Sequence, residues 1–120
     1  MKKLFVGILL MSASFSSLAF NTGKDLVLAS VMYNAWDASG RVLDGKNGSY
    51  QAISFFFYVN GAASALHSTN GICIPQGVVM NDIERSVASY IQDNANKIKP
   101  MSAALAVTTA LKNTYPCVIK

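Results

Sequence analysis

Charged side chains are scarce in this 120-residue sequence. Asp, Glu, Lys and Arg together make up 13% of the residues, whereas 52% are hydrophobic. The six acidic residues are scattered along the chain. Asp82 and Glu84 stand two positions apart, and residues at that spacing do not share a helix face. A pair of carboxylates working as a catalytic acid and base is therefore not expected.

Histidine and cysteine are also rare. His67 is the single histidine, and Cys73 and Cys117 are the two cysteines. The sequence has no CxxC, HExxH, P-loop or GxGxxG pattern, and no motif supports a Ser-His-Asp arrangement among its many serines. We therefore predict a protein that is not an enzyme and that holds no metal and no cofactor.

The first nineteen residues have the three parts of a secretory signal peptide. Lys2 and Lys3 form a basic start, residues 4–11 are an apolar run, and small residues stand at two of the positions Ser17-Leu18-Ala19. The apolar run is well short of the roughly 20 residues of a transmembrane helix. We expect cleavage after Ala19, with a retained anchor as the alternative, and one domain over residues 20–120.

Export has consequences for charge and for the cysteines. Without the two leader lysines the net charge falls from +4 to about +2, which is too small a surplus to favour nucleic acid or a membrane surface as partner. Two cysteines in an oxidising compartment predict a disulfide between Cys73 and Cys117. A metal pair or a redox pair fits less well, because there is no CxxC and His67 is alone. The long loop closed by the disulfide would add about 4 kcal/mol of stability in the chain-entropy model.

Apolar periodicity predicts four helices. The first spans about Thr22 to Asp37 and begins with a capping arrangement of Thr22 and Asp25. A glycine-rich loop follows between residues 40 and 48. The second helix spans about 50–66, although its aromatic run would also suit a strand. A polar loop, His67 to Gly71, comes next, and an extended stretch with a turn covers residues 72–77.

The aromatic run Phe55-Phe56-Phe57 would spread over most of the circumference of the second helix. One face of a small domain cannot cover all three rings, so this helix is either central or partly buried by a second chain. Gly61 costs about 1 kcal/mol relative to alanine inside a helix. Close approach of another helix is the usual reason for a glycine at such a position.

The third and fourth helices have their own boundary signals. Asn81 with Glu84 resembles a capping box at the start of the third helix. Pro100 suits the first turn of the fourth helix, and Pro116 would end it just before Cys117. These elements predict an all-α fold, a small four-helix domain stapled by the disulfide Cys73–Cys117.

The part of the chain from Ile72 to Cys117 carries a recognisable pattern. It contains Cys73-Ile74-Pro75 with Gly77-Val78, then Pro100 with Ala103-Ala104-Leu105, and finally Tyr115-Pro116-Cys117, with Tyr58-Val59-Asn60-Gly61 upstream. This pattern resembles the Tai family of type VI secretion amidase immunity proteins. The sequence departs from the family pattern at Met80, where a threonine is common, and at Ala62-Ala63-Ser64, where an acidic residue is usual.

The resemblance implies a periplasmic, all-helical protein that carries a disulfide within its chain and acts as a homodimer. Its partner would be a peptidoglycan amidase of the NlpC/P60 type, delivered by the type VI machine of a neighbouring cell. A loop between helices would fill the amidase cleft and deny the substrate access to the nucleophile. The best match for that loop is His67, Ser68, Thr69, Asn70 and Gly71, and the loop at residues 40–48, around Asp44 to Asn47, is the second candidate.

Two other functions remain open from the sequence. A small periplasmic acid-stress chaperone would also be helical and disulfide-bonded, but such chaperones are rich in charge, and this chain has few titratable groups. An envelope binding module is the other possibility. A neighbouring gene for an NlpC/P60-like enzyme would favour immunity over both.

Overall fold

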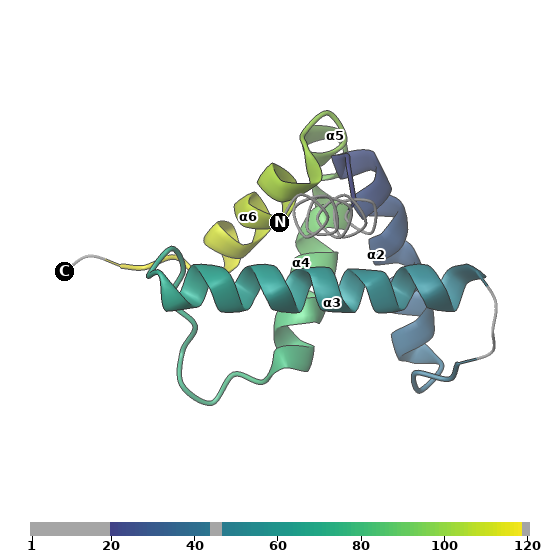
Figure 1. Ribbon diagram of the computed structural model, residues 1–120, viewed down its shortest axis with the longest axis horizontal. Coiled ribbons are helices and arrows are strands. Elements are labelled where there is room, and N and C mark those ends of the chain that lie inside the picture. Colours follow the sequence, from purple (N-terminus) through teal and green to yellow (C-terminus); the bar gives the residue numbers. More distant parts are fainter. Residues whose placement is uncertain (1–19, 44–46, 119–120) are drawn as a thin grey trace, which may run out of the picture.

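The computed structural model describes residues 20–43 and 47–118, and within these ranges the protein is all-α (Figure 1). The signal peptide predicted at residues 1–19 lies outside them. The helices are α2 Gly23–Ala38, α3 Asn47–Ser68, α4 Met80–Asp93, α5 Ala95–Ile98 and α6 Ala103–Thr114. The predicted all-α fold with its disulfide is confirmed. The short α5 is additional to the four predicted helices.

The start of α2 follows the sequence prediction. Thr22 Oγ1 accepts a hydrogen bond from the backbone N–H of Asp25 at 3.2 Å, and the N–H of Thr22 donates to Asp25 Oδ2 at 3.4 Å. This reciprocal pair satisfies two backbone donors that the first helical turn leaves without intrahelical partners. The capping box predicted from Thr22 and Asp25 is therefore confirmed.

The capping box predicted for the third helix is wrong. The residue at the N-cap of α4 is Val79, and no side chain caps the helix there. Glu84 is fully buried, and its Oε1 accepts hydrogen bonds from the Tyr33 hydroxyl and from Arg41. These partners hold Glu84 in the interior, so its carboxylate does not return to the start of its own helix.

The predicted start of the fourth helix at Pro100 is also wrong. Ser102 caps α6, with Oγ accepting from the N–H of Leu105 at 3.2 Å, so the helix begins at Ala103. The chain before the cap is paired with the N-terminal segment. The N–H of Gly23 donates to Met101 O at 2.7 Å. Pro100 therefore lies in a turn after α5 and outside any helix.

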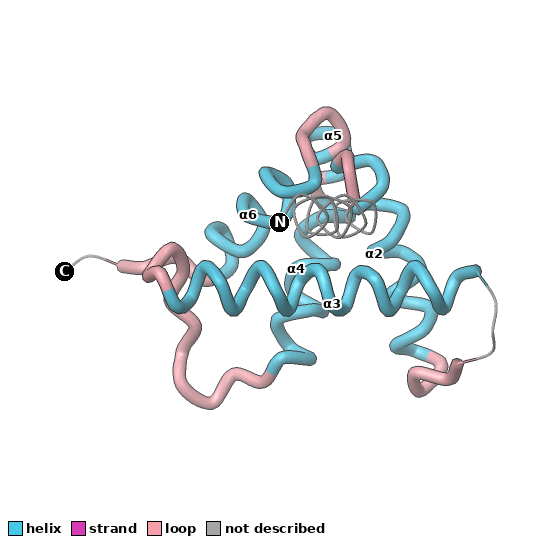
Figure 2. The backbone as a smooth tube through the Cα atoms, viewed as in Figure 1, coloured by secondary structure: helices cyan, strands magenta, loops and turns pink. Residues whose placement is uncertain are grey.

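Helix α3 runs along the long axis of the molecule and packs on α2, α4 and α6 (Figure 2). Side chains from every helix form one core, whose largest buried members are Tyr33, Phe55, Leu26, Ile72, Ile83, Ile91, Ile98 and Leu111. Phe55 is fully buried and Phe56 is half-buried, but Phe57 is 67% exposed. Helix α3 is therefore central, which is one of the two alternatives that the aromatic run predicted. The domain nevertheless leaves Phe57 uncovered.

In the ranges 20–43 and 47–118, no helix is both long and apolar enough to cross a membrane. The disulfide joins Cys73, in the connection between α3 and α4, to Cys117 beyond the end of α6. It closes a loop with a sequence separation of 44 residues. The last three helices therefore lie within one covalent loop.

Candidate partner-binding loop

The predicted loop His67 to Gly71 is the tightly closed end of α3. His67 and Ser68 still belong to the helix. Asn70 adopts a left-handed backbone conformation with φ +61°. Its N–H donates to His67 O at 3.2 Å, and the N–H of Gly71 donates to Leu66 O at 2.7 Å. This is a Schellman motif, which pairs carbonyls that a helix end leaves without partners.

Side chains and packing fix the same turn. The hydroxyls of Ser68 and Thr69 each donate to the carbonyl oxygen of Ala65 at 3.0 Å. A Cβ added at Gly71 would lie 3.0 Å from a methyl group of Leu66, which is tighter than ordinary contact. Asparagine is one of the residues that tolerate φ above zero, and glycine suits the crowded position after it. The turn therefore holds one shape that is set by its sequence.

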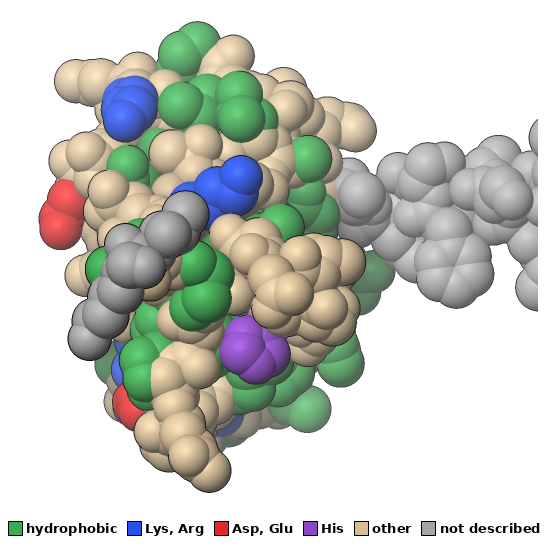
Figure 3. All heavy atoms as spheres, turned by 90° about the vertical axis from the view of Figure 1, so that its left-hand side faces the viewer, with side chains coloured by type: hydrophobic (Ala, Val, Ile, Leu, Met, Phe, Trp, Pro, Cys, Tyr) green, Lys and Arg blue, Asp and Glu red, His purple; other side chains and the backbone are tan. Residues whose placement is uncertain are grey.

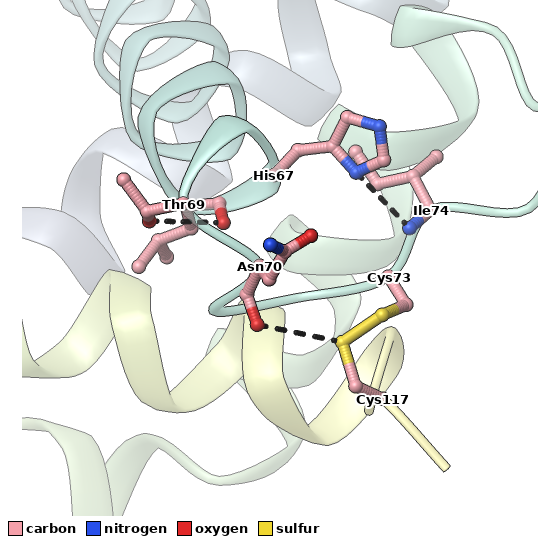
Figure 4. The surroundings of a disulfide bond; sticks show 7 residues. His67, Thr69, Asn70, Cys73, Ile74 and Cys117 are labelled. Carbon is pink, nitrogen blue, oxygen red and sulfur yellow. Dashed lines mark hydrogen bonds between the residues drawn. A yellow bond between two sulfur atoms is a disulfide. The ribbon is translucent and has the colours of Figure 1, made fainter. Parts of the chain in front are cut away.

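Contacts to the rest of the chain hold this turn in place (Figure 4). The N–H of Cys73 donates to Tyr115 O at 3.0 Å, next to the disulfide. Cys117 Sγ lies 3.7 Å from the carbonyl oxygen of Asn70. His67 Nδ1 accepts from the N–H of Ile74 at 3.5 Å. The loop is thus attached to the C-terminal segment on one side and to the following connection on the other.

The turn is on the surface. His67, Ser68, Thr69 and Asn70 are exposed and Gly71 is partly exposed. Figure 3 shows His67 on this end of the molecule with hydrophobic side chains next to it. The chain thus presents four polar side chains on a fixed backbone, beside apolar surface.

The next turn is also exposed, and we did not predict it as part of a binding surface. The N–H of Val78 donates to Pro75 O at 3.3 Å, and Gly77 has φ +93°. This is the geometry of a type II turn, in which glycine stands at the third position. Pro75, Gln76 and Gly77 are exposed. The pattern Pro-Gln-Gly predicted the turn, and Ile74, the residue before it, donates its N–H to His67 Nδ1.

The second candidate loop, residues 40–48, is described only at its two ends, and Asp44 to Lys46 lie outside the described residues. The chain leaves α2 through Gly40 with φ +83° and Arg41 with φ +64°. A left-handed backbone is unfavourable for arginine and needs support from its surroundings. That support comes from the Arg41 side chain.

Arg41 is the centre of a polar cluster that the sequence did not reveal. One guanidinium nitrogen, Nη2, lies 2.9 Å from Glu84 Oε1 and 3.1 Å from the Tyr33 hydroxyl. Nε pairs with Asp37 Oδ1 at 3.1 Å, and the guanidinium carbon lies 4.9 Å from the centre of the Trp36 ring. A planar guanidinium can bind a carboxylate and stack on an aromatic ring at the same time.

The same cluster shifts the pKa values of Asp37 and Tyr33. A hydrogen bond from Arg85, followed by one from Arg41, holds the pKa of Asp37 below its ordinary value. Burial, and next the hydrogen bond to Glu84, raises the pKa of the Tyr33 hydroxyl well above its ordinary range. Tyr33 therefore remains a hydrogen-bond donor at any physiological pH, and Asp37 remains a carboxylate. The cluster fixes the end of α2 against α4.

The groups at the 67–71 turn are suited to contact with a partner. In the described part of the chain, no three His, Cys, Asp or Glu side chains gather as a metal site. Both cysteines are in the disulfide. The 67–71 turn offers exposed hydroxyl, amide and imidazole groups on a fixed backbone. This arrangement can bind a protein surface by hydrogen bonding and shape.

The comparison with protein families identifies the partner class. Residues 22–117 match the model of the Rap1a immunity proteins. The chain belongs to the Rap1a immunity protein family. The match includes α2 to α6, both cysteines and both candidate loops. Membership of an immunity family implies a cognate effector as the binding partner. Neither the curated proteins nor the solved structures gave a match.

Proposed function

We propose that this member of the Rap1a family is a periplasmic immunity protein that binds a type VI secretion peptidoglycan amidase of the NlpC/P60 type. It occludes the active site of the amidase and protects the cell from its own or sibling toxin. Family membership supports the immunity role. The choice of an amidase comes from the resemblance to the Tai family, and the periplasmic location from the signal peptide pattern.

The observation that carries the mechanism is the closed turn at the end of α3. Its exposed polar side chains sit on a backbone that the Schellman hydrogen bonds, the Leu66 contact and the neighbouring disulfide hold in one conformation. A loop that is already ordered loses little conformational entropy when it binds. The turn can therefore enter a cleft and exclude substrate without chemistry of its own.

Co-purification with the amidase encoded beside this protein is the first test. The mature chain and the amidase, expressed together in the periplasm, should form a complex, and the cells should survive. Cells expressing the amidase alone should lyse. Failure to bind and to rescue would contradict the proposed function.

Variants of the turn test which surface binds. Thr69→Arg adds a bulky charge to an exposed site and should weaken binding of the amidase by more than tenfold, because a desolvated charge at an interface needs a partner. Asn96→Arg makes the same kind of change at an exposed position of α5, and should leave binding unchanged. Equal affinity of both variants and the wild type would transfer the site to the loop at residues 40–48.

The homodimer implied by the resemblance is part of the same proposal. Size-exclusion chromatography with light scattering measures it directly. A mass equal to that of one chain at tens of micromolar would contradict it.

A further inference from the structure

The exposed side of α3 is free of charge. The 22 residues Asn47–Ser68 include no Asp, Glu, Lys or Arg. Most surface helices present charged side chains to water. At 100° per residue, one narrow stripe of α3 holds residues 50, 54, 57, 61, 64 and 68. Five of these are exposed and Ser54 is half-buried.

The stripe combines two large rings with small residues. Tyr50 and Phe57 are each 67% exposed. A Cβ added to Gly61 would meet nothing within 4 Å, so no part of the described chain occupies the space over it. The close approach of a helix that the sequence predicted at Gly61 is thus missing among residues 20–43 and 47–118. Beside Gly61, a groove of about 490 Å³ runs between α3 and α6, lined by Phe57, Ala62, Ala65, Ala104 and Thr108 among others.

The order of residues along the stripe is self-complementary. When two copies of α3 pair antiparallel about a two-fold axis at residue 59, Phe57 lies opposite Gly61. Tyr50 then lies opposite Ser68, and Ser54 opposite Ser64. Each ring therefore meets a small residue of the other copy, and no ring meets a ring. A two-fold interface requires this kind of match, because the same surface contributes both sides.

We propose that this stripe, together with the α3–α6 groove, is the dimer interface, with a second copy of this chain as its occupant. The inference rests on the dimer of the proposed function and identifies its surface. In the pair, the Phe57 ring of each copy fills the space over Gly61 of the other and enters the groove beside it.

The lack of Asp, Glu, Lys and Arg on α3 favours a second copy, and the exposed rings supply part of the area that such a pair needs. Pairing about a two-fold axis places each surface against itself, so any charge near the axis would face its own copy. The basic residue of α3 is His67, in the last turn and far from the axis. Aromatic side chains bury roughly 150–250 Å² each. With two-thirds of that area still exposed, the four rings of a pair would cover about 400–650 Å². This is roughly a third to a half of the approximately 1,200 Å² at the lower end of stable interfaces.

The antiparallel arrangement covers only Ser68 of the proposed amidase site, because Thr69, Asn70 and Gly71 lie beyond the stripe. The two ends of α3 lie about 33 Å apart at 1.5 Å per residue. The two 67–71 turns of a pair are therefore at opposite ends of the interface.

Gly61→Glu is the decisive variant. The side chain has room within its own chain, so the fold should be retained, as far-ultraviolet circular dichroism and thermal unfolding will show. In the dimer it would place two carboxylates opposite two rings near the axis. We expect the dissociation constant of the dimer to rise about a hundredfold. Light scattering should give one chain for Gly61→Glu and two for the wild type.

Leu28→Glu is the matched control. Leu28 is 51% exposed on α2 and belongs to another apolar surface, with Val31 at 48%. We expect this variant to remain a dimer. A wild type that is monomeric removes the dimer itself. If Gly61→Glu remains a dimer, or if Leu28→Glu dissociates instead of Gly61→Glu, the dimer exists but its interface is not on α3.

Cross-linking tests the register. Ser54→Cys mixed with Ser64→Cys should give a covalent dimer under mild oxidation, because these positions face each other. Either variant alone should not, because the same residue in the two copies is about 15 Å apart along the axis and a disulfide spans at most about 7 Å between Cα atoms. Cross-linking of one variant with itself would overturn the antiparallel register.

Discussion

The Tyr33 hydroxyl donates a hydrogen bond to Glu84 Oε1 at 2.8 Å, across 51 positions of sequence. Both side chains are fully buried. With Arg41 as the third member, this pair connects the C-terminal part of α2 to the first half of α4. The carboxylate is stable there because a cation and a hydroxyl replace the water it has lost.

Tyr33→Phe tests that relationship. The substitution keeps the ring in the core but removes one donor to a buried carboxylate, and hydrogen bonds to charged groups contribute about 1.5–3 kcal/mol. We expect the free energy of unfolding in urea to fall by that amount at neutral pH. Tyr58→Phe removes a hydroxyl from a half-buried ring on α3 and should change stability by less than about 0.5 kcal/mol. Equal losses in the two variants would contradict the special role of Tyr33.

The Asp37 carboxylate should make stability depend on pH in acid. Its pKa is lower in the folded protein than in the unfolded chain, because Arg85 and Arg41 hydrogen-bond to it. Its contribution is therefore fully present above its ordinary pKa of about 4 and is lost as pH falls through the lower folded pKa. Asp37→Asn should give a shallower decline of the melting temperature below pH 4. A decline parallel to that of the wild type would show that other carboxylates dominate.

Gly23 and Gly61 should respond in opposite ways to alanine. Gly23 is buried where a Cβ would collide with the backbone carbonyl of Ile98, so Gly23→Ala must push α5 away and should cost at least about 2 kcal/mol. Gly61 has open space and a helical backbone, so Gly61→Ala should add about 0.5–1 kcal/mol. Urea unfolding measures both, at protein concentrations low enough to keep the chain monomeric. A neutral Gly23→Ala would contradict the close packing of α2 on α5.

Removal of the disulfide should affect the 67–71 turn before it affects the core. The buried core draws on every helix and needs no cysteine, whereas Cys117 and Tyr115 directly contact residues 70 and 73. We expect Cys73→Ser/Cys117→Ser to lose about 2–4 kcal/mol of stability and to remain helical. Relative to the wild type, hydrogen exchange should accelerate more at the Gly71 and Cys73 amides than at the amides of α4. Unchanged exchange at both amides would contradict this coupling.

The sequence predicted local structure well and long-range structure poorly. The α2 cap, the α3 helix and the disulfide depend on neighbouring residues or on an even cysteine count, so the sequence alone could predict them. Glu84 was assigned to the wrong partner because a capping box and a buried ion pair look alike in sequence. The choice between them depends on Tyr33 and Arg41, 51 and 43 positions away. Pro100 was misplaced because the pairing of Gly23 with Met101 is equally remote.

The candidate site shows the same division. The polar composition of residues 67–71 predicted a surface turn, and the turn is there. The hydrogen bond from the Ile74 N–H to His67 Nδ1 gave no signal in the sequence. The Arg41 cluster gave no local signal, because its acidic partner is on another helix.

The covalent loop closed by Cys73 and Cys117 has one more consequence. The exposed Pro75–Val78 turn is inside that loop, as are α4, α5 and α6. A protease that cut the backbone at this turn would leave two pieces still joined through sulfur, with every helix intact. The nicked molecule would run as one band on a non-reducing gel and as two after reduction. A cut at this exposed turn would therefore leave both pieces in one covalently joined molecule.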